Sequence, residues 1–535
     1  MPFTRECNFS SEEMEKAKVC SDPNWQCLPD CILMHIFDFL GAKDIPKAGL
    51  ACRHWHRVSE DEFLWRKLIS QTWKISVKKL PPGKSSWKEE YRRLDFHSPV
   101  LCSELLVDHT DEVLYVTFTK HGQYFATVSR DVTVKLWKVD YPTHVMSDRD
   151  MQAALLWDCM HYACFNDAGT YLMVGGIKTR VGYGAVLDID HGLEVLLVFE
   201  MFPYGLGAWL NDHTFVAGRN IDRSNSLQIK AFTVPNVEEF YPYQQVLPLE
   251  SCGDVIYTFY HETDRFTDIT IETFDCIPGP VLPTVPRHKC KSKVTTAPSK
   301  PSTDTACTWF KTVSFVAGDY LLHIKNLGAA LSSVNTCGTG NTLYCHPYNT
   351  GLDQALPHLG PNDPIVVEND VQLPSVDVPD HVVCLKGHVT GYKFVVSDET
   401  KQKFLFYNYR PLTSTADELS LGEAIEMRAL DLSTLEDIGV SYIGHQARSP
   451  FPGWRLYVDV TEDYVASGSE DSCGYLWDRH YGVCLAKYEH TSGVVNAVAF
   501  SPTDQEYAVT IGDDHMIKVW RSRNKMKRVP PTNTL

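Results

Sequence analysis

A tryptophan-terminated repeat constrains this chain more than any other feature of its sequence. Three segments, SRDVTVKLW, SEDSCGYLW and GDDHMIKVW, end at Trp137, Trp477 and Trp520. An aspartate lies six residues before each tryptophan, and a histidine lies 28, 32 and 30 residues before it. Each segment closes on the alternating apolar pattern that is typical of a half-buried β-strand. The recurrence therefore predicts a fold assembled from repeated supersecondary units.

Each repeat also carries polar side chains that can satisfy one another. A buried imidazole, carboxylate, hydroxyl or indole N–H is costly without a partner, so we expect a hydrogen-bonded network inside each unit. The expected members are His109, Ser129, Asp131 and Trp137 in the first unit, His445, Ser469, Asp471 and Trp477 in the second, and His490, Asp514 and Trp520 in the last. In the last unit Gly512 stands where the hydroxyl is expected. Two alternatives remain there, a substitute hydroxyl from Thr510 or a looser unit.

This spacing resembles the WD repeat, whose four-stranded units form the blades of a β-propeller. The resemblance implies an all-β WD-repeat propeller over residues 100–521, with seven blades predicted and eight as the alternative. Between Trp137 and His445 only strand texture remains, and we assign the surplus length to insertions near 276–305 and 346–381. The residues before the first histidine, 101–107, are expected to add an outer strand to the final blade and so remove an open sheet edge.

A helical module of about 45 residues precedes the repeats. Its apolar residues at 32, 33, 36, 37 and 40 follow the spacing of one helix face, and Gly41 then supplies a stop signal. The module resembles the F-box across its whole length. The matching positions are Leu28, Pro29, Ile32, Leu33, Ile36, Phe37, Leu40, Asp44, Cys52, Trp55, Val58, Leu64 and Trp65. So few residues bury too little apolar surface to be comfortably stable alone, so we expect another protein's helices to complete the module.

The combination of an F-box, a helical linker and a propeller resembles the F-box/WD-repeat proteins. The resemblance implies that the F-box binds the adaptor Skp1 and, through it, a cullin-1/RING ligase core. The residues that it implies for Skp1 binding are Leu28, Pro29, Ile32, Leu33, Ile36, Phe37, Leu40 and Trp55. The implied function is that of a non-catalytic substrate-recognition subunit of an SCF-type (Skp1–cullin–F-box) E3 ubiquitin ligase.

Two alternatives to this function stay open. One is a WD-repeat scaffold that does not act in ubiquitination, and the other is an adaptor on a cullin-4 ligase. Some WD proteins dock a cullin-4 adaptor through a Trp-Asp-x-Arg motif, but here Trp477 and Asp478 are followed directly by Arg479, one place early. That linkage is therefore disfavoured.

The predicted organisation is a leader over 1–25, an F-box domain over 26–70, a helical linker over 71–99, the propeller over 100–521 and a basic tail over 522–535. The formal net charge is −17. The first 100 residues carry 16 basic and 14 acidic side chains, so the acidic excess lies beyond them. An acidic propeller disfavours nucleic-acid binding and favours basic over phosphorylated substrate segments. From blade geometry, the candidates for substrate contact at the mouth of the channel are Arg130, Glu470 and Asp513.

Signals for membranes, secretion and cofactors are weak. The N-terminus is charged where a signal peptide needs an apolar core, and the 17 cysteines are sparse for a disulfide scaffold. We expect a soluble protein of the cytosol, with the nucleus as a second location and no membrane partner. The Gly-Lys-Ser at 83–85 lacks the first glycine of a P-loop, and CMHYAC at 159–164 lacks a paired C-x-x-C set. We therefore predict no cofactor and no metal site.

Overall fold

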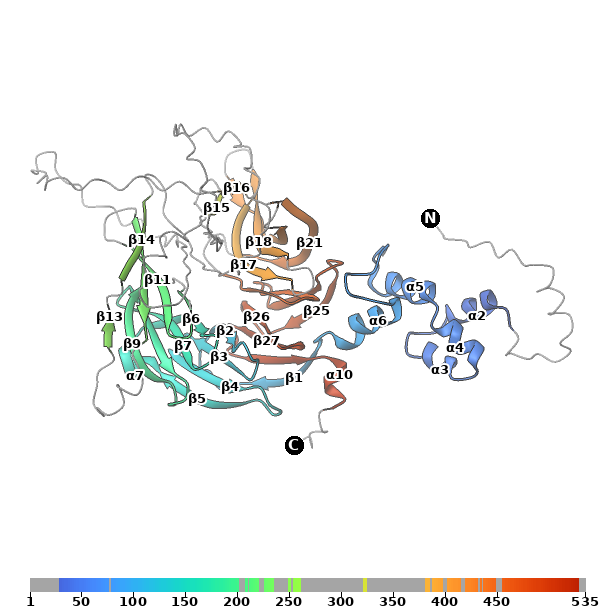
Figure 1. The fold of residues 1–535 in the computed structure, drawn as a ribbon, viewed down its shortest axis with the longest axis horizontal. Coiled ribbons are helices and arrows are strands. Elements are labelled where there is room, and N and C mark those ends of the chain that lie inside the picture. The colour runs from blue at the N-terminus through green and yellow to red at the C-terminus, as the bar shows by residue number, and fades with distance from the viewer. Residues whose placement is uncertain are drawn as a thin grey trace, which may run out of the picture. The chain divides into compact units, whose positions relative to one another are not determined.

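The computed structural model describes residues 28–76, 78–201, 207–209, 211–220, 226–234, 249–251, 254–260, 321–324, 381–384, 387–397, 402–414, 419–431, 434, 436–448 and 455–528. The chain divides into two compact units, Met1–Ser98 and Pro99–Leu535. The described part of the first unit is helical and that of the second is built mainly from strands, as Figure 1 shows. The predicted leader over 1–25 and the insertion at 276–305 lie outside the described residues, as does the insertion near 346–381 except for His381.

The first unit holds short helices whose starts are set by local side chains. They are α2 (Asp30–Phe37), α3 (Ile45–Gly49), α4 (Arg53–Ser59), α5 (Glu62–Trp73), α6 (Trp87–Arg92) and the π-helical turn η2 (Arg93–His97). The carboxylate of Asp61 accepts the backbone N–H groups of Phe63 and Leu64, so it caps the otherwise unpaired amides at the start of α5. Ser86 caps α6 in the same way. The helices enclose a small core that includes Leu33, Phe37, Ile45, Val58, Leu64, Trp65 and Ile69.

The second unit consists mainly of antiparallel sheets. The first is β2 (Val113–Phe118), β3 (Tyr124–Ser129), β4 (Thr133–Lys138) and β5 (His144–Asp150). The second is β6 (Cys159–Phe165), β7 (Tyr171–Lys178), β8 (Val181–Asp188) and β9 (Glu194–Met201), which β13 (Leu249–Ser251) extends in parallel. The third is β10 (Gly207–Trp209), β11 (Thr214–Asn220), β12 (Ser226–Thr233) and β14 (Asp254–Tyr260). The helix α7 (Met151–Leu155) joins the first sheet to the second.

Three further sheets of this kind follow along the chain. One is β17 (Gly387–Val396), β18 (Lys403–Ser414), β20 (Ala424–Asp431) and β21 (Glu436–Gln446), with β19 (Leu419–Leu421) beside β18. The next is β22 (Val458–Val460), β23 (Tyr464–Ser467), β24 (Cys473–Asp478) and β25 (Cys484–Glu489). The last is β26 (Val495–Ser501), β27 (Asp504–Gly512), β28 (Ile517–Arg521) and β1 (Leu101–Leu106). The pair β15 (Leu321–Ile324) and β16 (His381–Cys384) forms a separate two-stranded sheet, and the helix α10 (Arg523–Met526) follows β28.

The first strands of these sheets line a common axis. Contacts join them in the order β10, β6, β2, β26, β22 and β17, so successive sheets present their first strands to the same centre. Apolar residues fill the space between neighbouring sheets. Side chains of β3 and β4 pack against β6, β7 and β8, and those of β27 and β28 pack against β2. This is the architecture of WD-propeller blades, which confirms the predicted fold class, and the described residues supply six such sheets and the pair β15–β16.

The strand at the start of the second unit joins the last sheet. β1 pairs with β28 in antiparallel register, from Leu101 opposite Arg521 to Leu106 opposite Ile517. The guanidinium of Arg521 holds the junction from one side, since it donates to Ser103 and Glu104 of β1 and to the carbonyl of Asp140. The prediction that residues 101–107 add an outer strand to the final blade is confirmed for 101–106. The N-terminal strand of the second unit is thereby hydrogen-bonded into the sheet formed by its last strands.

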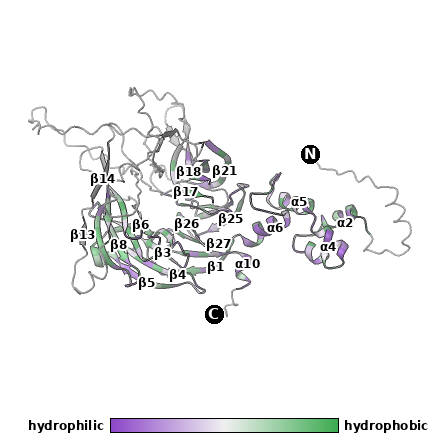
Figure 2. Cartoon of the chain, in the orientation of Figure 1, coloured by the Kyte–Doolittle hydropathy of each residue, from purple (hydrophilic) through white to green (hydrophobic). Residues whose placement is uncertain are grey.

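Hydropathy follows the packing. Figure 2 shows hydrophobic colouring along the strands of the sheets, whereas the helices of the first unit mix both colours and α4 is strongly hydrophilic. Among the described residues, no helix combines the length and the apolar character needed to span a bilayer.

Candidate functional site

The face of α2 predicted to bind Skp1 divides between core and surface. Leu33 and Phe37 are completely buried inside the helical unit, where the ring of Phe37 meets Trp55 edge to face at 5.7 Å. The side chain of Ile32 is 43% exposed. Of the other predicted contacts, Leu28, Pro29, Ile36, Leu40 and Trp55 are half-buried. The structure therefore corrects the predicted roles of Leu33 and Phe37, because they build the core and offer no surface to a partner.

Two residues that sequence reasoning missed are the most exposed large apolar side chains of the module. Phe39, just after α2, is 79% exposed, and Leu50, at the end of α3, is 81% exposed. Phe39 continues the spacing of Ile32 and Ile36 by one more helical step, and this is the signal that could have found it. Large apolar side chains with this exposure are candidates for contact with a partner protein. We call Ile32, Ile36, Phe39 and Leu50 the F-box apolar surface.

A carboxylate fixes the first helix of the module against the third. Asp30, the first residue of α2, lies 2.7 Å from His54 Nε2 and accepts from Arg57 at 2.6 and 2.8 Å, both residues of α4. The hydrogen bond from Arg57 is the main reason that the pKa of Asp30 is lowered. The contact therefore ties α2 to α4.

The histidine–aspartate–tryptophan repeats do form networks, with a different hydroxyl from the predicted one. In the first unit, His109 Nδ1 lies 2.9 Å from Asp131, and the hydroxyl of Thr127 lies 2.8 Å from His109 Nε2 and accepts the indole N–H of Trp137 at 2.9 Å. Although burial raises the pKa of Asp131, hydrogen bonds from His109 and Thr133 hold it well below its usual range. Ser129 instead donates to the carbonyl of Asp111 and accepts the N–H of Asp131, so it closes the turn that follows β3.

The last unit repeats this arrangement and is complete. The hydroxyl of Thr510 lies 2.8 Å from His490 Nε2 and accepts the indole N–H of Trp520 at 2.9 Å, while His490 Nδ1 lies 2.8 Å from Asp514. Burial raises the pKa of Asp514, but the hydrogen bond from His490 outweighs it together with smaller causes and lowers the pKa to about 2. The bridging hydroxyl thus lies ten residues before the tryptophan rather than eight, and Gly512 weakens no network.

The unit that ends at Trp477 is the one that departs from the pattern. Asp471 accepts the hydroxyl of Tyr475 at 2.6 Å, and His445 turns its Nε2 to Asn408 at 3.0 Å. Nδ1 of His445 has no hydrogen-bond partner among the described residues, and burial lowers the pKa of this histidine to about 3. Trp477 donates to the carbonyl of Ile443. The expectation of a complete network from His445, Ser469, Asp471 and Trp477 is therefore wrong, since Ser469 caps a turn by donating to Gln446.

The three predicted substrate contacts follow β3, β23 and β27 and are all bound within the fold. Arg130 pairs with Glu112 at 3.0 Å, and Glu470 accepts the backbone N–H of Arg448. Asp513 accepts the N–H of Val494 and the amide of Asn496. These contacts give Arg130, Glu470 and Asp513 structural roles, and substrate binding by them remains a prediction.

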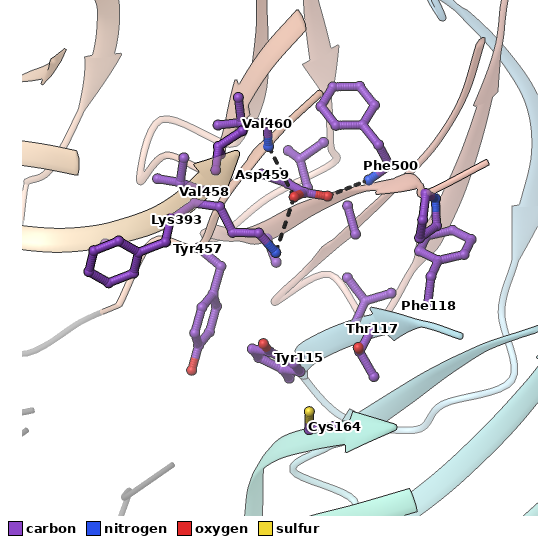
Figure 3. Close-up of a pocket in the computed structure, with 18 of the residues that line it drawn as sticks. Tyr115, Thr117, Phe118, Cys164, Lys393, Tyr457, Val458, Asp459, Val460 and Phe500 are labelled. Carbon is purple, nitrogen blue, oxygen red and sulfur yellow. Dashed lines mark hydrogen bonds and ion pairs between the residues drawn. The ribbon is translucent and has the colours of Figure 1, made fainter. Parts of the chain in front are cut away.

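A cavity of about 850 Å³ occupies the axis between the first strands of the six sheets (Figure 3). It reaches the turns that join the first two strands of several sheets, such as Asp167 between β6 and β7, Glu462 between β22 and β23 and Thr503 between β26 and β27. We call it the hairpin-end cavity. Arg130, Glu470 and Asp513 do not line it. They belong to turns between second and third strands, which lie at the opposite end of the axis because the strands are antiparallel.

Arg479, the residue considered for cullin-4 docking, is turned into the fold. Its side chain is 12% exposed, donates to the carbonyl of Thr461 and lies over the rings of Phe404 and Phe406 at 5.4 Å. An arginine held in this way offers little of its charge to a partner. No group of three or more histidine, cysteine, aspartate or glutamate side chains with metal-binding geometry occurs in the described part of the chain.

Comparison with known proteins supports both halves of this description. The family described as F-box-like matches residues 25–71, and the family described as WD domain, G-beta repeat, matches 100–138 and 482–521. The chain is 28% identical to F-box/WD repeat-containing protein 5 of Homo sapiens, covering 94% of this chain and 95% of that protein. The corresponding protein of Rattus norvegicus is 29% identical, covering 92% and 94%. A shorter match, 33% identical over 18% of this chain and 16% of the relative, is the WD repeat-containing protein 26 homolog of Arabidopsis thaliana. With an F-box-like module, WD-propeller sheets and similarity along nearly its whole length, the chain is similar to the F-box/WD repeat-containing proteins.

Proposed function

We propose that this protein is the substrate-recognition subunit of an SCF-type ubiquitin ligase, with the F-box binding Skp1 and the propeller holding the substrate. The single observation that carries the proposal is the F-box apolar surface, on which Phe39 and Leu50 expose about four fifths of their side chains. Because covering such apolar side chains lowers the free energy of the complex, the surface suits packing against the helices of an adaptor. The similarity to F-box/WD repeat-containing protein 5 supports the same assignment.

The proposed role needs no chemistry from this chain. A substrate held on the propeller is brought near the ubiquitin-transferring subunits through Skp1, cullin-1 and the RING subunit, so its lysines react at a raised effective concentration. The cullin-4 alternative receives no support from Arg479, whose side chain is engaged inside the fold.

The test is binding of purified Skp1 to the full chain, measured by isothermal titration calorimetry. The variants are Phe39→Asp and Leu50→Asp, and the matched control is Met146→Asp, which places the same charge at a half-exposed apolar residue of β5. Because each aspartate would be desolvated at the interface, we expect the two F-box variants to weaken binding by at least about tenfold and the control to leave it unchanged. Binding that is equal in all four proteins would reject the surface, and no binding by the parent chain would favour the scaffold alternative.

A further inference from the structure

A stretch with charges of one sign only covers α5, the start of α6 and the segment that joins them (Figure 1). Between Glu62 and Glu89 the sequence holds no acidic residue, although the whole chain has a formal net charge of −17. The basic residues of this stretch are Arg66, Lys67, Lys74, Lys78, Lys79, Lys84 and Lys88. A local excess of one sign attracts groups of the opposite sign. The stretch is therefore a candidate anion-binding surface on an otherwise acidic protein.

Basic residues on the two helices are engaged within the fold. The ammonium of Lys67 lies 2.5 Å from Asp38, and that of Lys88 pairs with Glu60. The guanidinium of Arg66 lies over a tryptophan ring, 5.9 Å from its centroid. A partner protein would have to compete with these contacts. The helices are therefore the less accessible part of the basic stretch.

Three lysines of the joining segment differ from those on the helices. The side chains of Lys74, Lys78 and Lys79 are exposed, and none of them forms an ion pair or a side-chain hydrogen bond within the described part of the chain. Lys74 follows the last residue of α5, so the carbonyl groups at that helix end favour its charge. Lys78 and Lys79 lie beyond the last turn, where this effect has faded. We call these three residues the lysine segment.

The chain is fixed to the helical unit on both sides of the lysine segment. On one side, the ring of Trp73 lies 5.1 Å from that of Tyr91 on α6. On the other side, Pro81 is buried, and Glu62 accepts the backbone N–H of Trp87 at 2.8 Å. A segment that is held on both sides loses less conformational freedom on binding than a free chain does. The lysines are thus presented together rather than on a free tail.

The surroundings of the lysine segment favour a short acidic peptide over a lipid surface or a nucleic acid. Among the described residues, no large apolar side chain between Phe63 and Leu101 is exposed, whereas a membrane-binding segment needs such side chains beside its cations. Single-stranded nucleic acids stack on accessible rings, but Trp73 is half-buried and Trp87 is buried. A long polyanion would also be repelled by the acidic remainder of the chain.

We propose that the lysine segment binds an acidic segment of a partner protein, in which several aspartate or glutamate residues lie close together. Each ammonium group takes a carboxylate as the partner that the fold does not supply. Because each exposed ion pair is weak, binding depends on the three lysines together and is screened by salt. The proposal does not rest on the proposed function, since it needs neither Skp1 nor a ubiquitination substrate.

The experiment is fluorescence anisotropy on the full chain without Skp1. The probe is a fluorescein-labelled peptide of alternating glutamate and serine, and the comparison peptide carries glutamine in place of glutamate. Because glutamine keeps the shape of glutamate without its charge, this pair isolates the contribution of the carboxylates. The test variant combines Lys74→Gln, Lys78→Gln and Lys79→Gln. The matched control removes the same charge from exposed lysines elsewhere, and it combines Lys43→Gln, Lys120→Gln and Lys487→Gln.

The two triple variants have the same net charge, so a difference between them reports the position of the lysines. We expect the glutamate peptide to bind and the glutamine peptide to bind at least about tenfold more weakly. The test variant should weaken the glutamate peptide by a similar factor, whereas the control should change its affinity by less than about twofold. Raising the salt concentration from about 0.05 M to about 0.3 M should also weaken the glutamate peptide, because exposed charges are then screened.

Three outcomes overturn the proposal. The first is no binding of the glutamate peptide at millimolar concentration, and the second is equal weakening by the test variant and the control. The third is tighter binding of an oligothymidine or of phosphatidylserine vesicles that the test variant abolishes, which would identify a nucleic-acid or membrane surface instead. If a thermal melt shows that the test variant does not fold, the double variant Lys78→Gln and Lys79→Gln, which leaves the end of α5 unchanged, decides. Skp1 titrated onto the test variant separates this proposal from the proposed function, because a variant that retains Skp1 and loses the peptide bears on the lysine segment alone.

Discussion

Thr510→Val tests the blade network at the hydroxyl that joins its histidine to its tryptophan. The hydroxyl of Thr510 is completely buried and serves two partners, His490 Nε2 at 2.8 Å and Trp520 Nε1 at 2.9 Å. Valine has nearly the same shape, so the substitution removes the hydroxyl without leaving a cavity. Each buried partner that loses its bond costs about 1–3 kcal/mol. Allowing for the extra buried methyl group, we expect the free energy of unfolding to fall by about 2–4 kcal/mol.

The assay is urea denaturation of the full chain, followed by tryptophan fluorescence. The control is Thr110→Val, the same chemical change at an exposed threonine, for which we expect a change within about 0.5 kcal/mol. If Thr510→Val were no more destabilised than this control, the hydroxyl would not bridge the histidine and the indole, and the looser last unit considered from Gly512 would be the better description.

Three further predictions concern pH and backbone space. The pKa of Asp514 in the folded protein is about 2, below its ordinary 3.8. The charged carboxylate therefore stabilises the fold fully above pH 3.8, and this stabilisation is lost as the pH falls toward 2. Urea midpoints measured between pH 5 and pH 2 should fall more steeply for the parent chain than for Asp514→Asn. Burial disfavours the charged form of His445, so its folded pKa is about 3 against an ordinary 6.5. The histidine therefore costs no stability above pH 6.5, and the fold loses stability progressively as the pH falls below that value. Its imidazole NMR signals should still report the neutral form at pH 5, and a charged signal there would refute the desolvation. Gly391→Ala would place a Cβ 1.9 Å from the carbonyl oxygen of Leu456, so we expect the free energy of unfolding to fall by about 1–3 kcal/mol or more. Gly41→Ala, whose Cβ would meet nothing closer than 3.9 Å, should be tolerated in the same urea assay.

The blades with intact repeats could be predicted because the residues that recur in their sequence need hydrogen-bond partners when they are buried. The positions of histidine, aspartate and tryptophan led directly to the pairs His109–Asp131 and His490–Asp514. The predicted hydroxyl is two residues from the observed one, because the side chains eight and ten residues before the tryptophan lie on the same face of a strand. Only the structure shows that Thr127 lies within β3, while Ser129 is the strand's last residue and turns to the loop.

The sheets between Trp137 and His445 carry no such pattern, because aromatic packing takes the place of the polar network. Phe199, Phe215 and Phe232 lie with ring centroids 4.6–5.2 Å apart between β9, β11 and β12. Aromatic packing has no fixed partner at a fixed spacing, so its sequence shows only strand texture. The same reason explains why Tyr115 of β2, Tyr162 of β6 and Tyr457, just before β22, were not predicted as one cluster, since they come from distant parts of the chain.

Polar side chains at both ends of the axis are engaged in bonds within the fold. At one end, the turns between second and third strands hold the histidine networks, and Arg130, Glu470 and Asp513 are used by neighbouring backbone and side-chain groups. The polar groups of these three side chains are therefore already engaged in hydrogen bonds within the fold. At the hairpin end, side chains near the turns also join one sheet to the next, as Lys120 does to Asp167, Gln505 to Asp463 and Asp459 to the backbone of Phe500. Contact of Arg130, Glu470 and Asp513 with a substrate would therefore have to compete with the bonds that these residues already make within the fold.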